Sequence, residues 1–429
     1  MKKVGIVSLG CQKNLVDSEN ILGLFDRNGY EITSDPKEAD VIVINTCGFI
    51  ESAKKESIEN ILEMLNYNKK IVVTGCLVQR YLTELKKEIP EVDAFIPIRE
   101  YEHFNKHFAV IDPSVDTSIG LDDEYRIIST GPFSAFLKIG EGCDNCCTYC
   151  AIPLIRGHFV SRDSEAIIKE ARDLASNGIK EITILEQDTT KYGIDLKEKT
   201  DIVDLLKQLL KIKEFDYIRL LYLYPDEISD ELIDLISKEK RLTPYFDIPI
   251  QHSESHVLKD MNRRGDKEFL RNLFTKIRNK IPNAILRTTI MVGFPGETME
   301  DVNNLIEFMK EIKFDHLGAF TYSQEEGTKA FDLPNQVEEC EKNKRRDLVM
   351  KAQQKISYSQ NKLHIGEVME GLVIGKEHDN YLLRSYFNAP DDIDGKIFVK
   401  SNKILNLGDK IRVKITDAFV YDLMGEIVE

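Results

Sequence analysis

The sequence lacks several features that would assign it to common classes of protein. Its 429 residues contain no run of about 18 apolar residues, so we expect no membrane span. The first apolar run, residues 4–9, is shorter than the core of a secretory signal peptide and is better explained as a β-strand. No internal repeat, low-complexity segment, P-loop or dinucleotide-binding glycine motif is present. We therefore expect a cytoplasmic protein.

Positive charge is also in short supply. The chain has 58 Lys and Arg against 73 Asp and Glu, a formal net charge of −15. Proteins that bind nucleic acid usually present a basic surface to the phosphate backbone. Direct nucleic-acid binding is therefore not expected, although an acidic chain can still bind RNA through a local basic patch.

The length predicts two or three domains, and the first of them reads as an α/β unit. Short runs rich in Val and Ile at 3–9, 40–45 and 70–74 have the continuous apolar character of buried parallel strands. Helical patterns lie between them, at about 15–27 and 50–65. We predict an N-terminal domain with an open parallel α/β sheet over residues 1–120, and a linker at about 99–131.

Two further patterns follow the linker. Six strand-like segments separated by helical stretches predict a partial parallel (β/α) barrel over residues 130–355. These segments lie at 135–139, 181–185, 217–222, 245–250, 284–292 and 316–322. After a charged helix at about 337–362, the pattern alternates with period two at 368–374, 381–387, 396–400 and 410–420. This last pattern predicts a small antiparallel β-barrel over residues 360–429.

The sequence contains eight cysteines. In a chain without a signal peptide, grouped thiols favour metal ligands or catalytic groups over disulfides. Cys143, Cys147 and Cys150 form a C-x3-C-x2-C loop after the first barrel strand, and three thiolates at this spacing can hold a [4Fe–4S] cluster with one open iron. Cys146 raises the alternative of zinc, but no second cysteine pair follows downstream. Cys146 is then a spare thiol, and Cys340 lies in the charged helix.

A second set of cysteines is dispersed. Cys11, Cys47 and Cys76 each follow a predicted strand of the first domain. Because parallel strands end at the same edge of a sheet, we expect the three thiols to converge there and to hold a second [4Fe–4S] cluster. Gly10 and Gly75 leave room for close backbone approach. The alternative is three separately buried cysteines.

The loop at Cys143, with Tyr149 before its last cysteine, resembles the radical S-adenosylmethionine (SAM) superfamily. The resemblance implies that SAM chelates the open iron and that one electron cleaves it to a 5′-deoxyadenosyl radical. The segment with Gly293 and Glu297 is similar to the family's adenine-binding segment. The segment Glu186, Gln187 and Asp188 ends the second barrel strand, where the family contacts the methionyl group of SAM. Ordinary strand-to-helix loops are the alternative at both places.

Both cysteine sets, together with the terminal barrel, resemble the methylthiotransferase family over almost the whole chain. The resemblance implies an N-terminal cluster domain, a radical-SAM barrel and a small TRAM barrel. It also implies two [4Fe–4S] clusters, SAM as cofactor, a reducing electron donor and a sulfur source. One SAM would methylate the sulfur atom that is transferred, and a second SAM would supply the radical that removes hydrogen from the acceptor carbon. A radical is needed because an unactivated C–H bond is not acidic enough for a general base to deprotonate.

Within that family, the segments at 45–50, 187–190, 247–252 and 318–323 are similar to the branch that modifies an aspartate of a small-subunit ribosomal protein. Gln12 is instead typical of the branch that modifies an adenosine of the tRNA anticodon loop. We expect a monomeric enzyme that places a methylthio group on the aspartate β-carbon of protein twelve of the small subunit. The tRNA activity is one alternative, and an iron–sulfur scaffold or electron carrier is another.

Charge bears on this choice of substrate. Residues 356–429 contain nine Lys or Arg against twelve Asp or Glu, a net of −3. An acidic terminal barrel suits docking of a basic ribosomal protein better than gripping of tRNA phosphates. The alternative is a solvated surface without a docking role.

Overall fold

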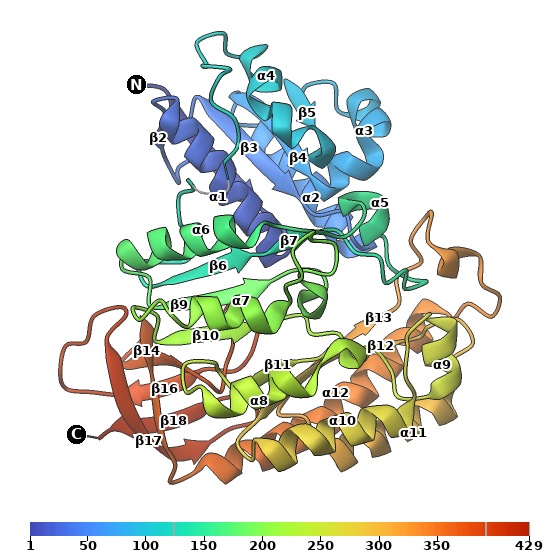
Figure 1. Ribbon diagram of the computed structural model, residues 1–429. Coiled ribbons are helices and arrows are strands. Elements are labelled where there is room, and N and C mark those ends of the chain that lie inside the picture. The colour runs from blue at the N-terminus through green and yellow to red at the C-terminus, as the bar shows by residue number, and fades with distance from the viewer. Residues whose placement is uncertain (123–124, 391–392, 429) are drawn as a thin grey trace.

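The computed structural model describes residues 1–122, 125–390 and 393–428. Figure 1 shows three parts in chain order: an N-terminal sheet domain, a central barrel-like domain and a C-terminal β-barrel. Within these ranges, no helix combines the length and the apolar character that a membrane span requires.

The N-terminal domain is built on a five-stranded parallel sheet with strand order β2-β1-β3-β4-β5. Its strands are β1 (Lys3–Ser8), β2 (Glu31–Ile32), β3 (Val41–Thr46), β4 (Lys70–Gly75) and β5 (Ala94–Ile96). Its helices are α1 (Gln12–Arg27), α2 (Glu51–Leu65), α3 (Cys76–Glu88) and α4 (Phe104–Ala109). The three predicted strands are β1, β3 and β4, and the two short outer strands complete the predicted open parallel sheet.

The segment expected to be a linker belongs largely to this first domain. Residues 98–109 form the 3-10 helix η1 (Ile98–His103) and α4. Phe104, Phe108 and Val115 are buried in the same hydrophobic cluster as the sheet. The prediction of a linker from about residue 99 was wrong because scattered Pro, Asp and Ser mask a few large apolar side chains.

The central domain contains the six expected strands in two three-stranded parallel sheets, with orders β10-β9-β6 and β11-β12-β13. The strands are β6 (Ser134–Lys138), β9 (Glu181–Leu185), β10 (Tyr217–Leu220), β11 (Tyr245–Asp247), β12 (Ile285–Val292) and β13 (His316–Thr321). A short antiparallel ribbon is added by β7 (Gly140–Glu141) and β8 (Val160–Ser161). The helices are α5 (Ile152–Arg156), α6 (Ser164–Ser176), α7 (Ile202–Leu209), α8 (Asp230–Lys238), α9 (Ser255–Asp260), α10 (Lys267–Lys280), α11 (Met299–Ile312) and α12 (Glu339–Asn361). The arrangement is the predicted partial barrel.

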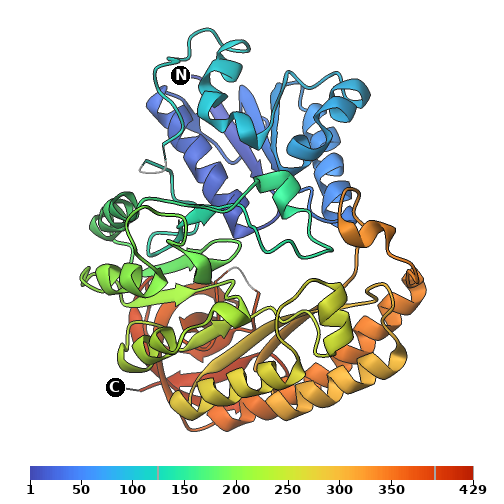
Figure 2. The same cartoon turned by 45° about the vertical axis from the view of Figure 1, so that its right-hand side comes forward.

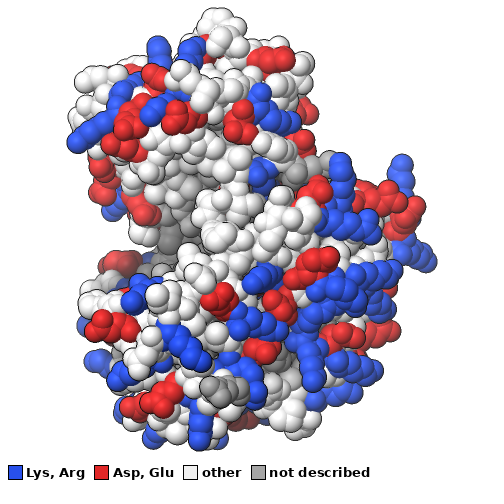
Figure 3. All heavy atoms as spheres, turned by 90° about the vertical axis from the view of Figure 1, so that its left-hand side faces the viewer, with Lys and Arg blue, Asp and Glu red and all other residues white. Residues whose placement is uncertain are grey.

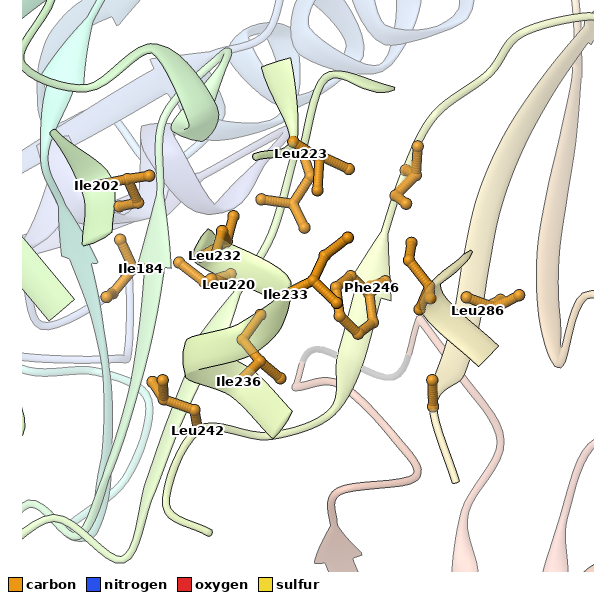
Figure 4. Close-up of a cluster of buried hydrophobic side chains, with 14 of the residues drawn as sticks. Ile184, Ile202, Leu220, Leu223, Leu232, Ile233, Ile236, Leu242, Phe246 and Leu286 are labelled. Atoms are coloured by element: carbon orange, nitrogen blue, oxygen red, sulfur yellow. The ribbon is translucent and has the colours of Figure 1, made fainter. Parts of the chain in front are cut away.

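One hydrophobic cluster holds the strands and their helices together. Figure 4 shows Leu220, Phe246 and Leu286 from successive strands beside Leu232 and Ile233 of α8. Five of the barrel helices begin with a side chain that accepts a hydrogen bond from their first turn, which satisfies a backbone N–H there. These capping residues are Asp163 (α6), Asp201 (α7), Ser229 (α8), Asp266 (α10) and Thr298 (α11).

The C-terminal domain is a closed five-stranded barrel with the order β14-β15-β16-β18-β17. Its strands are β14 (Val368–Glu377), β15 (Asn380–Ser385), β16 (Ile397–Lys400), β17 (Lys410–Ala418) and β18 (Leu423–Ile427). The prediction of an all-antiparallel barrel was wrong in one pair, because β16 and β18 pair in parallel. The last strand, which was not predicted, is the one that closes the barrel.

The two smaller domains cover opposite ends of the barrel strands (Figure 2). At the carboxyl end of β6, Lys138 is paired with Asp17 of α1 at 2.6 Å. At the amino end of β9, Glu181 is paired with Arg384 of β15 at 2.6 Å. Figure 3 shows that the molecule is indented where the N-terminal domain meets the rest, with charges of both signs over that face. The N-terminal domain therefore covers the barrel end at which ligands of such folds bind.

Candidate functional site

The three dispersed cysteines lie at one edge of the N-terminal sheet. Cys47 directly follows β3 and Cys76 directly follows β4, while Cys11 precedes α1 after β1. A β-carbon on Gly10 would lie 2.8 Å from Cys47 Cβ and 3.0 Å from Cys47 Sγ. The expected convergence of these residues is therefore present, and Gly10 provides the room for it.

The helices that begin at this edge carry no side-chain cap. Cys11 occupies the capping position of α1 without a side-chain hydrogen bond, and α3 begins at Cys76 after Gly75, whose φ is +95°. Uncapped helix starts present N–H groups and partial positive charge, which stabilise anions such as thiolates. Burial raises the pKa of Cys76 to about 12, and the nearby Arg156 guanidinium acts in the opposite direction.

The second cysteine set lies on the loop between β7 and α5. Cys147 Sγ is 3.7 Å from the Tyr224 hydroxyl and 3.8 Å from a guanidinium nitrogen of Arg263. Burial raises the pKa of Cys143 to about 11. Cys146 is exposed and has a left-handed backbone with φ of 52°. The loop thus buries three thiols partly and leaves the fourth in solvent.

Each cysteine set offers donors that fit a [4Fe–4S] cluster. The loop thiols are half-buried, whereas the dispersed set runs from the exposed Cys11 to the buried Cys76. In both sets the three thiols are the soft ligands that iron–sulfur clusters use. Within the described residues, no three His, Cys, Asp or Glu side chains are placed around a single metal ion. A cubane differs from such a site, since each thiolate binds a different iron.

The predicted SAM-contact segment after β9 is held by neighbouring loops. Asp188 accepts hydrogen bonds from Asn145 of the cysteine loop at 2.6 Å and from the Thr190 hydroxyl. Gln187 donates to Glu141 at 3.3 Å. Asp188 therefore fixes the cysteine loop against the barrel. The neighbouring Glu186 carboxyl has no hydrogen-bond partner within the described part of the chain.

The second predicted segment forms a tight turn after β12. The Gly293 N–H donates to both carboxylate oxygens of Glu297, at 3.0 and 2.9 Å. Arg345 of α12 also donates to Glu297 at 2.9 Å. A β-carbon on Gly293 would meet the side chain of Lys342 at 2.3 Å. These contacts show that Glu297 stabilises the turn after β12. A contact between Glu297 and SAM stays a prediction.

A buried charged cluster between the two domains was not foreseen. Asp17 of α1 accepts from Lys138 at 2.6 Å and from Arg156 at 2.7 Å. Arg156 also pairs with Glu141 at 2.9 Å and lies 3.8 Å from Cys76 Sγ. The sequence did offer one signal, because residues 12–20 are largely polar but lack the separate solvent face of an amphipathic helix. In the structure these residues are buried, apart from the half-buried Leu15.

A second contact joins the N-terminal domain to the loop after β13. Glu325 is buried and accepts from Arg80 at 2.8 Å and from Lys54 at 3.1 Å. Arg80 also donates to the carbonyl oxygen of Gly48, next to Cys47. This contact fixes the edge that carries the dispersed cysteines.

Comparison with known families and proteins agrees with this architecture. Residues 3–97 match the Uncharacterized protein family UPF0004, residues 137–309 the Radical SAM superfamily, and residues 365–428 the TRAM domain. The chain is 47% identical over 441 residues to the ribosomal protein uS12 methylthiotransferase RimO of Clostridioides difficile (strain 630), covering 100% of this chain and 99% of that protein. It is also 47% identical to the protein of that name from Caldanaerobacter subterraneus subsp. tengcongensis, with 99% of this chain and 100% of the relative covered.

Solved structures show the same fold at lower similarity. The radical SAM methyltransferase TsrM from Kitasatospora setae aligns with a TM-score of 0.54 and 14% identity, covering 74% of this chain and 73% of that one. The cobalamin-dependent SAM radical enzyme OxsB aligns with a TM-score of 0.51 and 13% identity, covering 83% and 56%. Because the chain is 47% identical to RimO proteins over nearly its full length, it belongs to the RimO family of radical-SAM methylthiotransferases.

Proposed function

We propose that this protein attaches a methylthio group to the β-carbon of an aspartate in ribosomal protein uS12. The observation that carries the proposal is that two sets of three cysteines lie on the two sides of one domain boundary, in a chain of the RimO family. An electron carrier needs neither two open clusters nor a barrel that encloses substrate.

Cys143, Cys147 and Cys150 would hold the cluster that binds SAM, and Cys11, Cys47 and Cys76 would hold the auxiliary cluster. When bound, these groups supply the electron that cleaves SAM and the site at which sulfur is delivered. The protein's own groups place the two cysteine sets at a common boundary, chiefly through the Arg156 contacts to Asp17 and Glu141. Asp188 and Asn145 hold the cysteine loop in register with β9.

The remaining parts of the proposal concern partners. An electron donor and a sulfur source are required, and we propose that the enzyme acts as a cytoplasmic monomer without binding nucleic acid directly. The C-terminal domain lies at the other end of the central strands from the cysteines, and the five-residue strand β9 between these ends is about 17 Å long. A basic protein that docks on the C-terminal β-barrel would thus need to extend a segment past the central barrel to reach the cysteines.

The test uses anaerobically reconstituted enzyme with SAM, sulfide and a strong reductant. Purified uS12 and tRNA anticodon-loop substrates are offered in parallel, and mass spectrometry looks for replacement of H by SCH3. A gain on one uS12 aspartate supports the proposal. A gain on the RNA alone overturns it and gives Gln12 the meaning that the tRNA branch suggests.

A further inference from the structure

A buried lysine lies between the N-terminal domain and the barrel, two residues after Cys11. The Lys13 side chain is 6% exposed, and its ammonium nitrogen lies 3.6 Å from the centre of the Tyr222 ring. It donates to the main-chain oxygen of Glu186 at 3.3 Å. Among the residues that the structure describes, no carboxylate lies within ion-pair distance of Lys13. The domain boundary therefore buries an amine that makes no ion pair with a carboxylate among these residues.

The carboxyl group of Glu186 is the matching feature on the barrel side. Glu186 is fully buried, and neither carboxyl oxygen has a hydrogen-bond partner among the described residues. Gly140 makes the space for it, because a β-carbon there would lie 1.8 Å from Glu186 Oε2. Burying polar groups without partners is costly, so such groups point to a ligand that completes them.

The other cations of this boundary are already committed. Lys138 and Arg156 both pair with Asp17 and with Glu141. Among the described basic residues Lys13, Lys138 and Arg156, Lys13 is thus the one that could bind a further carboxylate without breaking an ion pair.

Tyr222 supplies the wall beneath Lys13 and does so from a strained backbone. Its φ is +60°, an uncommon region for a bulky side chain, and such outliers cluster at functional sites. Its hydroxyl donates to the amide oxygen of Gln12 at 2.7 Å. The Tyr222 ring is therefore held by contacts from both domains.

We propose that Lys13 binds the side-chain carboxylate of the substrate aspartate. This inference rests on the proposed function. The acceptor β-carbon is bonded directly to the carboxylate carbon, so a cation that holds the carboxylate also fixes the β-carbon. The position two residues from Cys11 places that carbon beside the auxiliary cysteines. Burial raises the pKa of Glu186 well above its ordinary value, and a protonated carboxyl can donate to the incoming carboxylate.

A carboxylate has two possible sources here, the substrate aspartate and the methionyl end of SAM. The test therefore measures binding of both, by titration calorimetry with the anaerobically reconstituted full-length protein. The ligands are uS12, uS12 with its modified aspartate changed to Asn, and SAM alone. The variants are Lys13→Met and Lys13→Arg, with Lys86→Met on the exposed face of α3 as the matched control.

We expect the unchanged protein to bind uS12 roughly 10- to 100-fold more tightly than its Asp→Asn form. Lys13→Met should bring this ratio close to one, Lys13→Arg should keep part of it, and Lys86→Met should keep all of it. SAM affinity should change less than twofold. Iron content and circular dichroism check that each variant is folded.

Three results would overturn the inference. The first is that the unchanged protein modifies uS12 yet binds uS12 and its Asp→Asn form with equal affinity. The second is that a folded Lys13→Met variant keeps the affinity ratio between these two forms. The third is that Lys13→Met loses affinity for SAM instead. Absence of any SCH3 on uS12 would instead refute the proposed function itself.

Discussion

Two glutamates mark the opposite ends of one barrel strand, and their surroundings differ completely. Glu181 begins β9 and is paired with Arg384 at 2.6 Å and Arg219 at 3.4 Å. Glu186 follows the end of the same strand, equally buried, with no hydrogen-bond partner among the described residues.

The difference separates a structural end of the barrel from a functional one. At the amino end, facing the C-terminal domain, buried charges are matched by partners within the chain. At the carboxyl end, facing the N-terminal domain, Lys13 and Glu186 are left incomplete, and α1 begins without a side-chain cap. This agrees with the general rule that chemistry in such barrels occurs at the carboxyl ends of the strands.

The largest expected effect is at the functional end. Cys47→Ala should lower the iron content of reconstituted protein from about eight to about four and abolish methylthiolation, because one set of ligands is lost. SAM cleavage to 5′-deoxyadenosine should persist, since the loop cysteines are intact. Iron analysis and chromatography measure both. Cys340→Ala, an exposed cysteine on α12, is the control, and full iron content in Cys47→Ala would refute the assignment.

At the structural end, Glu181→Gln should destabilise the apo-protein by about 3–5 kcal/mol, because it leaves two buried arginines without a carboxylate. Urea unfolding measures the loss. Glu186→Gln is the matched change at the other end of the strand and should cost no stability at neutral pH, because it removes a buried carboxyl without a hydrogen-bond partner among the described residues. Equal losses in the two variants would contradict the division between the ends.

The two glutamates should also respond to pH with opposite signs. Burial alone would raise the pKa of Glu181, but Arg384 and Arg219 outweigh it and hold this pKa below its ordinary value. Its contribution to stability is therefore present above about pH 4.3 and lost as pH falls through the folded pKa. Burial raises the pKa of Glu186, so the wild type should lose stability relative to Glu186→Gln as pH rises from about 4.3 towards neutrality. Unfolding curves at pH 3.5, 5 and 7 test both signs.

The smallest effect concerns a helix start in the barrel. Thr298 caps α11 and forms a reciprocal capping box with Asp301. Thr298→Ala should cost about 1 kcal/mol of stability without changing iron content. Cys11→Ala, at the uncapped start of α1, should leave the stability of the apo-protein nearly unchanged but lower iron content after reconstitution. Thermal melts and iron analysis together distinguish the two kinds of helix start.

Much of this organisation followed from the sequence. The convergence of Cys11, Cys47 and Cys76 was predictable because neighbouring parallel strands must end at one edge. The six barrel strands were predictable from their apolar runs. The C-x3-C-x2-C spacing, with no second cysteine pair downstream, favoured an iron–sulfur ligand set over a paired zinc site, and this assignment stays a prediction.

Other features depend on contacts between distant residues and were not predictable. Arg156 and Asp17 are 139 positions apart, and nothing in either local pattern specifies the pair. The isolation of Glu186 depends on space left by Gly140. The parallel pairing of β16 with β18 follows from the closure of the barrel, and the strand propensities of the individual residues do not specify it.

The contact between Arg80 and Glu325 has a consequence for synthesis of the chain. The two residues are 245 positions apart. At about 5–20 residues per second, roughly 12–50 s separate the appearance of the arginine from that of its carboxylate. During this interval the nascent N-terminal domain holds its cysteines at an edge that the barrel has not yet covered. We expect iron or oxidants to reach those thiols most readily at this stage, before translation is complete.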